Sequence, residues 1–213
     1  MTDFDTPFLV KICGLTTLSD ANAAIDAGAN AVGLILASSP RQLTLDRALA
    51  IAEATRGRVL RTLVFRDDDD EFILRAQDLI DADAVQIHGP LSDELRGRLR
   101  EREVRVIKAL SIASDEFYEF NDATVDAVLV DGATPGSGEG HSWEALSERS
   151  FGVPVIGAGG LSDANVASVI RQTHVWGVDS ASGVESSPGV KDLELMNHFV
   201  ASAVGAFEDR DAS

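Results

Sequence analysis

The sequence predicts an α/β protein made of a single (β/α)8 barrel, the TIM-barrel fold, spanning residues 1–213. Short apolar, β-branched runs alternate with longer amphipathic stretches about every 20 to 30 residues, which is typical of parallel strands joined by helices. Eight such units fit a chain whose length suits one domain. An open doubly wound sheet is the alternative, but its first strand is often followed by a G-x-G-x-x-G turn, and KICGLTTLSD has none.

The apolar runs define the strands, and the residues around the amphipathic stretches define the helix ends. The expected strands are Leu9–Cys13, Ala31–Leu36, Val59–Phe65, Ala84–His88, Val104–Ala109, Ala127–Val130, Val153–Gly157 and Val175–Val178. Hydroxyl side chains that suit helix N-caps are Ser19, Thr44, Ser92 and Ser162. Gly28 and Gly57 stand where C-cap glycines belong, a closing helix is expected from about Lys191 to Ala206, and frayed termini are expected at 1–7 and 208–213.

The net charge of −17 is unusual for a domain of this size. It disfavours nucleic acid and anionic membranes as partners, because both would be repelled. Only three residues are lysines, and the other basic residues are all arginines. Two interpretations stay open: an ordinary acidic surface, or adaptation to a halophilic, salt-rich cytoplasm, where a Debye length of about 3 Å screens self-repulsion. The acidic run at 67–71 suits a solvated loop that leads into a helix better than a metal site.

Cysteine usage and the start of the chain indicate a cytoplasmic protein. Cys13 is the only cysteine, so it forms no internal disulfide and suits a reducing compartment. The segment MTDFDTPFLVKICG lacks the basic and apolar regions of a signal peptide. No apolar run approaches the roughly 18 residues that a membrane span needs.

Polar residues gather at the C-terminal ends of the expected strands. Side chains alternate between the two faces of a strand, so Lys11 and Cys13 are expected inside the barrel if Val10 and Ile12 face the helices. Further polar residues near strand ends are Gln86, His88, Lys108, Asp131 and Asp179. A purely structural core would use apolar residues here, and barrel enzymes place their chemistry at this mouth. Singly, a buried cysteine or a strand-end histidine is more often structural, whereas the joint pattern predicts an active site.

Two glycine-rich segments follow the last two strands and predict a phosphate site. They are GAGGLS at 157–162 and DSASGVE at 179–185, and the phosphate-binding candidates are Gly159, Gly160, Ser182 and Gly183. Glycine lets the backbone approach an anion, and barrels commonly bind phosphate with these two loops. A third glycine-rich stretch, at 131–140, is interpreted as a lid or as a plain surface loop.

Six segments in this order resemble the phosphoribosylanthranilate isomerase family over nearly the whole chain. They are KICGLT, SSPRQLT, VQIHG, DGATPGSGEGHSWE, AGGLSDANV and GVDSASGVESSPGVKD. Two departures stand out: Ser137 and residues 141–144 replace the usual Gly-Thr-Gly and Phe-Asp-Trp, and Ala181 lies in a usually serine-rich loop.

The resemblance implies an Amadori rearrangement of N-(5-phosphoribosyl)anthranilate to 1-(2-carboxyphenylamino)-1-deoxyribulose 5-phosphate in tryptophan biosynthesis, with no cofactor and no metal. It makes Cys13 the general base and Asp131 the general acid. Arg41 is expected to bind the anthranilate carboxylate, because a guanidinium matches a carboxylate. Lys11 is expected to favour the Cys13 thiolate. His88 and Asp179 are expected to position the sugar or the acid, with burial or Asp179 keeping Asp131 protonated.

Two other functions remain possible from the sequence. The first is another phosphosugar enzyme, such as an indole-glycerol-phosphate synthase or a metal-dependent epimerase. The epimerase would need several histidine ligands, and His88 is the only histidine at an expected strand end. A catalytically silent barrel that binds a phosphorylated ligand is a second, but it would not need both Cys13 and Asp131. A monomer is favoured, with a homodimer as the alternative.

Overall fold

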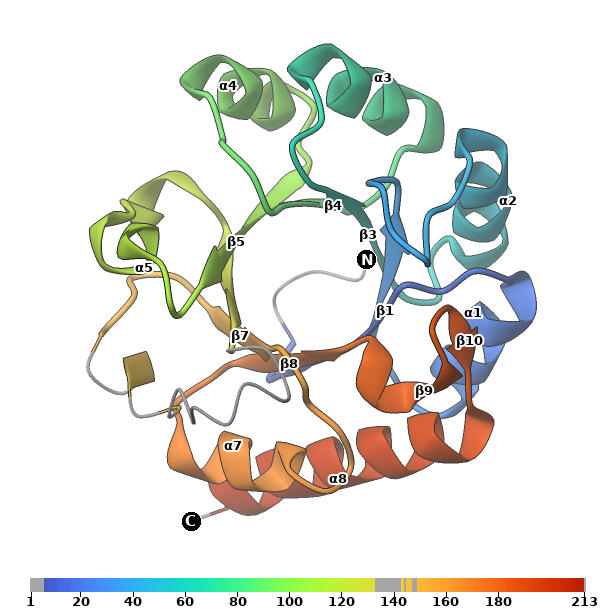
Figure 1. The fold of residues 1–213 in the computed structure, drawn as a ribbon, viewed down its shortest axis with the longest axis vertical. Helices are drawn as coiled ribbons and strands as arrows, with labels where there is room; N and C mark the ends of the chain where they lie inside the picture. Colours follow the sequence, from blue (N-terminus) through green and yellow to red (C-terminus); the bar gives the residue numbers. More distant parts are fainter. Residues whose placement is uncertain (1–5, 133–142, 144, 147–148, 213) are drawn as a thin grey trace.

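The computed structural model describes residues 6–132, 143, 145–146 and 149–212. Eight parallel strands pair in chain order and close into a barrel, with β8 pairing back onto β1. Helices surround this ring of strands (Figure 1). The predicted (β/α)8 barrel is therefore confirmed. An open sheet is excluded, because its first and last strands would not pair with each other as β1 and β8 do.

All eight predicted strands are present, with ends shifted by at most two residues. They are β1 (Leu9–Cys13), β2 (Ala31–Ile35), β3 (Leu60–Phe65), β4 (Ala84–Ile87), β5 (Arg105–Ser111), β6 (Ala127–Asp131), β7 (Val155–Ala158) and β8 (Gly177–Ser180). Two short strands that the sequence did not predict, β9 (Glu185–Ser187) and β10 (Val190–Lys191), form an antiparallel hairpin after β8.

In the described residues a helix follows each barrel strand as expected, except after β6, where most of the connection to β7 lies outside these residues. They are α1 (Leu18–Asp26), α2 (Leu45–Thr55), α3 (Asp70–Ile80), α4 (Asp93–Glu101), α5 (Asp115–Glu119), α7 (Val166–Gln172) and α8 (Leu193–Asp211), with short 3₁₀ turns η1 (Asp122–Thr124) and η2 (Ser182–Val184). Thr44 and Ser92 cap α2 and α4 as predicted.

Two predicted caps are wrong. Thr17, not Ser19, caps α1, because its hydroxyl accepts a hydrogen bond from the amide of Asp20 while Ser19 already lies inside the helix. Ser162 does not cap α7, because it forms a turn with Asn165 and the helix begins only at Val166.

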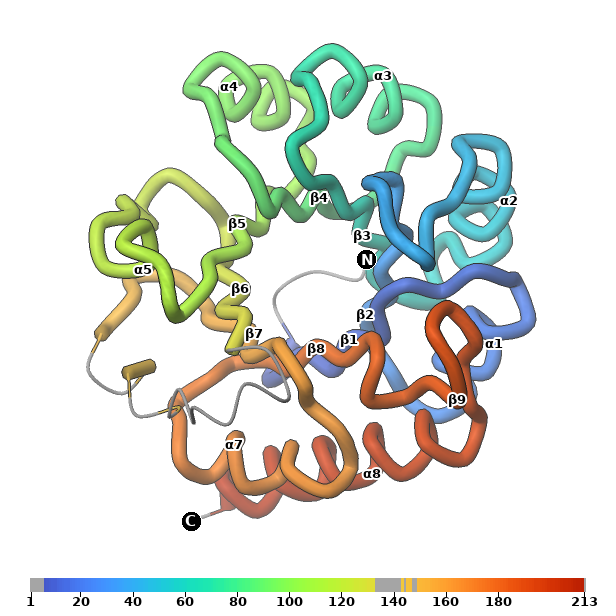
Figure 2. Tube along the Cα trace, viewed as in Figure 1, coloured from blue at the N-terminus to red at the C-terminus, as the bar shows by residue number. Residues whose placement is uncertain are grey.

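The closing helix α8 differs at both ends from the expected Lys191–Ala206. Lys191 belongs to β10, and the helix runs on to Asp211, into the segment for which we predicted fraying. Phe207 explains the extension, because it is fully buried and stacks on Phe8 with 4.8 Å between ring centroids. Figure 2 shows α8 lying alongside α7.

The strands separate two apolar cores, as their alternating side chains require. Val10, Ile12, Val85 and Ile87 pack in the outer core between strands and helices, as the alternation predicts. The inner core, which we call the apolar floor, fills the barrel below the mouth. It consists of Leu9, Ala31, Leu60, Ala84, Ile107, Ala109, Ala127, Leu129, Ile156 and Ala158.

Membrane spans and metal-binding clusters are both absent from the described residues. No helix in this part of the chain is both long and apolar enough to cross a membrane. Within the same residues, no group of three or more His, Cys, Asp and Glu side chains could hold a metal ion.

Candidate active site

A cavity of about 660 Å³ opens at the C-terminal ends of the strands. Most of the predicted site residues line it, although they come from six different segments of the chain. These are Cys13, Arg41, His88, Asp131, Gly159, Gly160, Asp179 and Ser182. The thiol and the carboxyl proposed for catalysis therefore share one cavity.

Lys11 lies beneath this cavity and ties three strands together. Its side chain is fully buried, and its Nζ donates to Asp179 Oδ1 and to Gln86 Oε1, both at 3.0 Å. The ion pair follows from the register, because Lys11 and Asp179 stand side by side on β1 and β8. Burial lowers the pKa of Lys11, but Asp179 and the Cys13 sulfur together raise it above its ordinary value. Lys11 is therefore a cation at the base of the site.

Cys13 is buried next to this cation. Burial raises the pKa of its thiol, and the charge and hydrogen bond of Lys11 lower it again without cancelling the effect. Lys11 thus acts in the direction predicted from the sequence, but burial outweighs it, so the resting thiol is mostly protonated at neutral pH. Forming the thiolate inside this site depends on Lys11 as the adjacent positive charge.

Gly33 makes room for the thiol and the ammonium group. It pairs with Cys13 in the sheet, and a Cβ atom there would lie 2.6 Å from Cys13 Sγ and 3.1 Å from Lys11 Nζ. Any larger residue would push one of these groups aside. The sequence analysis missed this glycine, because nothing near it in the sequence marks the contact.

Asp131 ends β6 at the mouth. Burial first, and then the charge of Asp179, raise the pKa of its carboxyl, while Arg66 opposes them. The shift has the direction and both causes expected from the sequence, and it favours the protonated form that an acid must have. Gly159, with φ +89°, packs so closely against Asp131 and Gly132 that a Cβ atom would collide with both. Gly159 therefore also shapes the pocket around the Asp131 carboxyl.

His88 is neutral, and its neighbours fix the position of its proton. Burial, helped by Arg66, Lys11 and Lys108, lowers its pKa to about 4. Gln86 Oε1 must face Lys11, because an ammonium group only donates, so the amide nitrogen of Gln86 faces His88 Nε2 at 2.7 Å. His88 Nε2 is therefore the acceptor, and Nδ1 carries the ring proton.

One polar residue assigned to the mouth lies elsewhere. Lys108 points away from the barrel interior, because its neighbours Ile107 and Ala109 occupy the inward positions of β5. Its Nζ pairs with Glu116 of α5 at 2.9 Å and lies over the ring of Phe120. The interpretation of Lys108 as part of the site is wrong.

The two glycine-rich loops after β7 and β8 meet at the backbone of Leu161. Ser180 Oγ donates to the Leu161 carbonyl at 2.7 Å, and Gly183 packs so closely on this carbonyl that no side chain would fit there. Gly183 is thus required by loop packing and does not itself line the cavity, unlike Gly159, Gly160 and Ser182. Most of the 131–140 loop lies outside the described residues.

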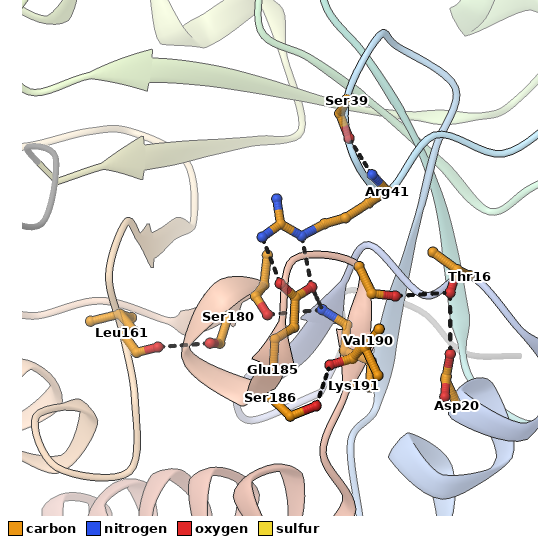
Figure 3. Close-up of polar contacts among 12 residues, drawn as sticks. Thr16, Asp20, Ser39, Arg41, Leu161, Ser180, Glu185, Ser186, Val190 and Lys191 are labelled. Atoms are coloured by element: carbon orange, nitrogen blue, oxygen red, sulfur yellow. Dashed lines mark hydrogen bonds and ion pairs between the residues drawn. The ribbon is translucent and has the colours of Figure 1, made fainter.

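Arg41 lines the cavity, and an acidic residue outside the cavity lining binds its guanidinium group. Its Nε and Nη2 each donate to one oxygen of Glu185 at 2.7 Å, and Glu185 Oε1 also accepts from Lys191 Nζ at 2.7 Å (Figure 3). Burial raises the pKa of Glu185, but the two cations outweigh it and leave the carboxyl ionised. Sequence analysis placed Glu185 and Lys191 in a motif without assigning them a role, and it gave none to Arg66 either.

Comparisons with known proteins agree on one family. A sequence model described as N-(5'phosphoribosyl)anthranilate (PRA) isomerase matches residues 10–202. The N-(5'-phosphoribosyl)anthranilate isomerase of Myxococcus xanthus is 42% identical, over 91% of this chain and 95% of its own length. The Thermotoga maritima phosphoribosyl anthranilate isomerase structure is 34% identical with a TM-score of 0.84, covering 93% of this chain and 99% of its own.

A further solved structure of the same enzyme contains a ligand. It is a phosphoribosyl anthranilate isomerase in complex with reduced 1-(O-carboxyphenylamino)-1-deoxyribulose 5-phosphate. It is 31% identical to this chain with a TM-score of 0.81, and the match covers 93% of this chain and 99% of the other.

Proposed function

This chain belongs to the N-(5'-phosphoribosyl)anthranilate isomerase family, and we propose that it isomerises this substrate with Cys13 as general base and Asp131 as general acid. Membership makes the chain an isomerase of tryptophan biosynthesis. What remains to be assigned is the role of each side chain.

The reaction starts with the acid. Protonated Asp131 gives its proton to the ribose ring oxygen, the bond from that oxygen to C1′ breaks, and the anthranilate nitrogen takes up the positive charge as an iminium ion. Burial beside Asp179, which raises the pKa of Asp131, supports this role. Arg66, whose charge acts in the opposite direction, stabilises the carboxylate left after the transfer.

The base acts next. The Cys13 thiolate removes the C2′ proton, the electron pair forms a C1′–C2′ double bond, and the iminium nitrogen becomes neutral. The resulting enol takes up a proton at C1′ from the Cys13 thiol and gives its C2′ hydroxyl proton to the Asp131 carboxylate, so the ketone forms and both side chains return to their starting states. Every step moves only protons and electron pairs between the substrate and these two side chains, so we expect no cofactor. Lys11 supports this role of Cys13, because its charge favours the thiolate.

The remaining predicted residues bind the two ends of the substrate. Gly159, Gly160 and Ser182 line the cavity where the phosphate loops come together, and we assign the phosphate to them. Arg41 is assigned to the anthranilate carboxylate. Asp179 holds Lys11 in place, and His88 presents a neutral imidazole to the sugar.

The observation that carries the proposal is the pairing of a buried thiol next to a cation with a half-buried carboxyl near an anion, in one cavity. Burial raises the pKa of both groups, which favours the neutral carboxyl that an acid requires. The charge of Lys11 acts against burial and favours the thiolate that a base requires.

A fluorescence assay that follows the disappearance of phosphoribosylanthranilate tests the roles. Cys13→Ala and Asp131→Asn should each lower kcat by about 10²- to 10⁴-fold, the usual size of one proton transfer. Asp46→Asn, on the exposed side of α2, is the matched control and should leave turnover unchanged. Undiminished turnover in both site variants would refute the mechanism and leave a different pair of groups to be found.

Two further assignments belong to the proposal. We place the protein in the cytoplasm, because a catalytic thiol must stay reduced. We propose a monomer, as predicted from the sequence; light scattering at working concentration tests this, and a mass of twice 22.6 kDa would contradict it.

A further inference from the structure

Arg41, Glu185 and Lys191 form a cluster of charged side chains at the edge of the cavity that is largely shielded from solvent. The Glu185 side chain is 3% exposed and the Lys191 side chain is fully buried, whereas the Arg41 side chain retains 19% exposure where it lines the cavity. Lys191 is held by Glu185 Oε1 at 2.7 Å and by the carbonyl of Ala181 at 2.8 Å. We call these three residues the arginine clamp.

Glu185 occupies only one edge of the Arg41 guanidinium group. A guanidinium has two edges that can each chelate a carboxylate, one formed by Nε and Nη2 and the other by the two Nη atoms. Glu185 takes the first edge with two hydrogen bonds of 2.7 Å. In Figure 3 the remaining nitrogen, Nη1, points away from Glu185, so the second edge is left for another acceptor.

The charges of the clamp leave one positive charge for a ligand. Arg41 and Lys191 are cations and Glu185 is an anion, so the cluster carries a net charge of about +1. A ligand carboxylate on the second edge would neutralise it. Without Lys191, Arg41 would stand between two carboxylates, which is unfavourable in a desolvated site because one negative charge would be uncompensated.

We propose that Glu185 and Lys191 are positioning residues that hold the free edge of Arg41 toward the carboxylate of the substrate, and so make the enzyme select a carboxylated aromatic amine. The inference rests on the proposed function, because it names what determines specificity at the same site. Neither residue touches the reacting atoms.

Contacts with neighbouring segments anchor the hairpin of β9 and β10 beside Arg41. Both Glu185 and Lys191 belong to it, and its turn is fixed by a 3.1 Å hydrogen bond from Thr16 Oγ1 to the Gly189 carbonyl. Gly189, with φ +83°, lies against the carbonyl of Pro40, next to Arg41 itself. Through Ala181 the clamp also contacts the loop assigned to the phosphate. One hairpin therefore sets the distance between the sites for the two anionic ends of the substrate.

The test compares two substrates in one assay format. The first is phosphoribosylanthranilate, and the second is the analogue made from aniline, which lacks the carboxylate. For wild type and Glu185→Gln, kcat and KM are measured with both. We expect Glu185→Gln to raise KM for the carboxylated substrate about tenfold with little change in kcat, and to leave KM for the aniline analogue unchanged. Glu185→Asp, which retains the charge, should recover part of the loss.

Matched controls separate positioning from general damage. Glu194→Gln, an exposed residue in the first turn of α8, should change neither KM. Arg41→Met should raise KM for the carboxylated substrate only, and adding Glu185→Gln to it should have no further effect. If Glu185→Gln does not fold, as judged by circular dichroism, Lys191→Met takes its place with the same expected pattern.

An equal rise of KM for both substrates would overturn the inference, because Glu185 would then support the fold rather than Arg41. An unchanged KM for both would overturn it as well. A wild-type chain that does not turn over phosphoribosylanthranilate at all would instead refute the proposed function, so the two failures are distinguishable.

Discussion

Lowering the pH from 7 to about 5 should destabilise the fold by about 2 kcal/mol through one side chain, His88. Burial and three nearby cations lower its pKa from 6.5 to about 4 in the folded protein. The unfolded chain therefore binds a proton at a pH where the folded chain does not. The neutral imidazole gives its full contribution to stability above about pH 6.5. This contribution is lost as the pH falls, and the loss reaches about 3 kcal/mol near pH 4.

Urea unfolding of the wild type and of His88→Gln at the two pH values measures this effect. Glutamine cannot titrate but offers an oxygen to Gln86 in place of Nε2, so the difference between the two proteins isolates the imidazole from the carboxyl groups. We expect the wild type to lose about 2 kcal/mol more than the variant. Parallel pH dependence in the two proteins would refute this reasoning. The tautomer is tested separately by ¹⁵N NMR, where a neutral proton on Nε2 would contradict the hydrogen bond assigned to Gln86.

Three other predictions concern the thiol, the glycine beside it and the surface charge. Lys11→Met should shift the alkylation rate of Cys13 by iodoacetamide to higher pH, because Lys11 lowers the pKa of the thiol; an unmoved curve would remove that role. Gly33→Ala should lower the free energy of unfolding by about 1–3 kcal/mol through overpacking. Gly97→Ala in α4, where nothing lies within 4 Å, should not destabilise, and equal losses at the two sites would contradict the steric argument. The urea midpoint should rise across a potassium chloride series if the charge of −17 reflects salt adaptation, and equal stability in dilute buffer would exclude this.

Much of the fold and part of the site follow from the period of two in a strand. Lys11 and Cys13 are separated by one residue, so they share a face. The apolar Val10 and Ile12 on the other face pack against the helices, which identifies the face of Lys11 and Cys13 as the inner one. Gln86 and His88 follow by the same reasoning. Lys108 was misplaced because its position near the end of β5 was weighed above the alternation, which assigns the inner face to Ile107 and Ala109.

The rest of the site depends on contacts between segments that are distant in the sequence. Arg41 and Glu185 are 144 residues apart, and no local pattern links them before the barrel closes. The contact of Gly33 with Cys13 follows from the register of β1 and β2, which only the strand pairing reveals. The choice between two possible N-cap residues also depends on the folded chain. Thr17 and Ser19 both suit an N-cap, and the choice depends on where the chain leaves β1.

The apolar floor has a consequence for the movement of hydrogen during turnover. It seals the lower end of the barrel beneath Lys11 and Cys13, so their exchange with water runs through the same mouth that a bound substrate covers. A hydrogen taken from the sugar by the sulfur is then shut in with the intermediate. Deuterium placed at that carbon should leave the enzyme slowly compared with turnover, so part of the label is expected to reappear in the product instead of the solvent.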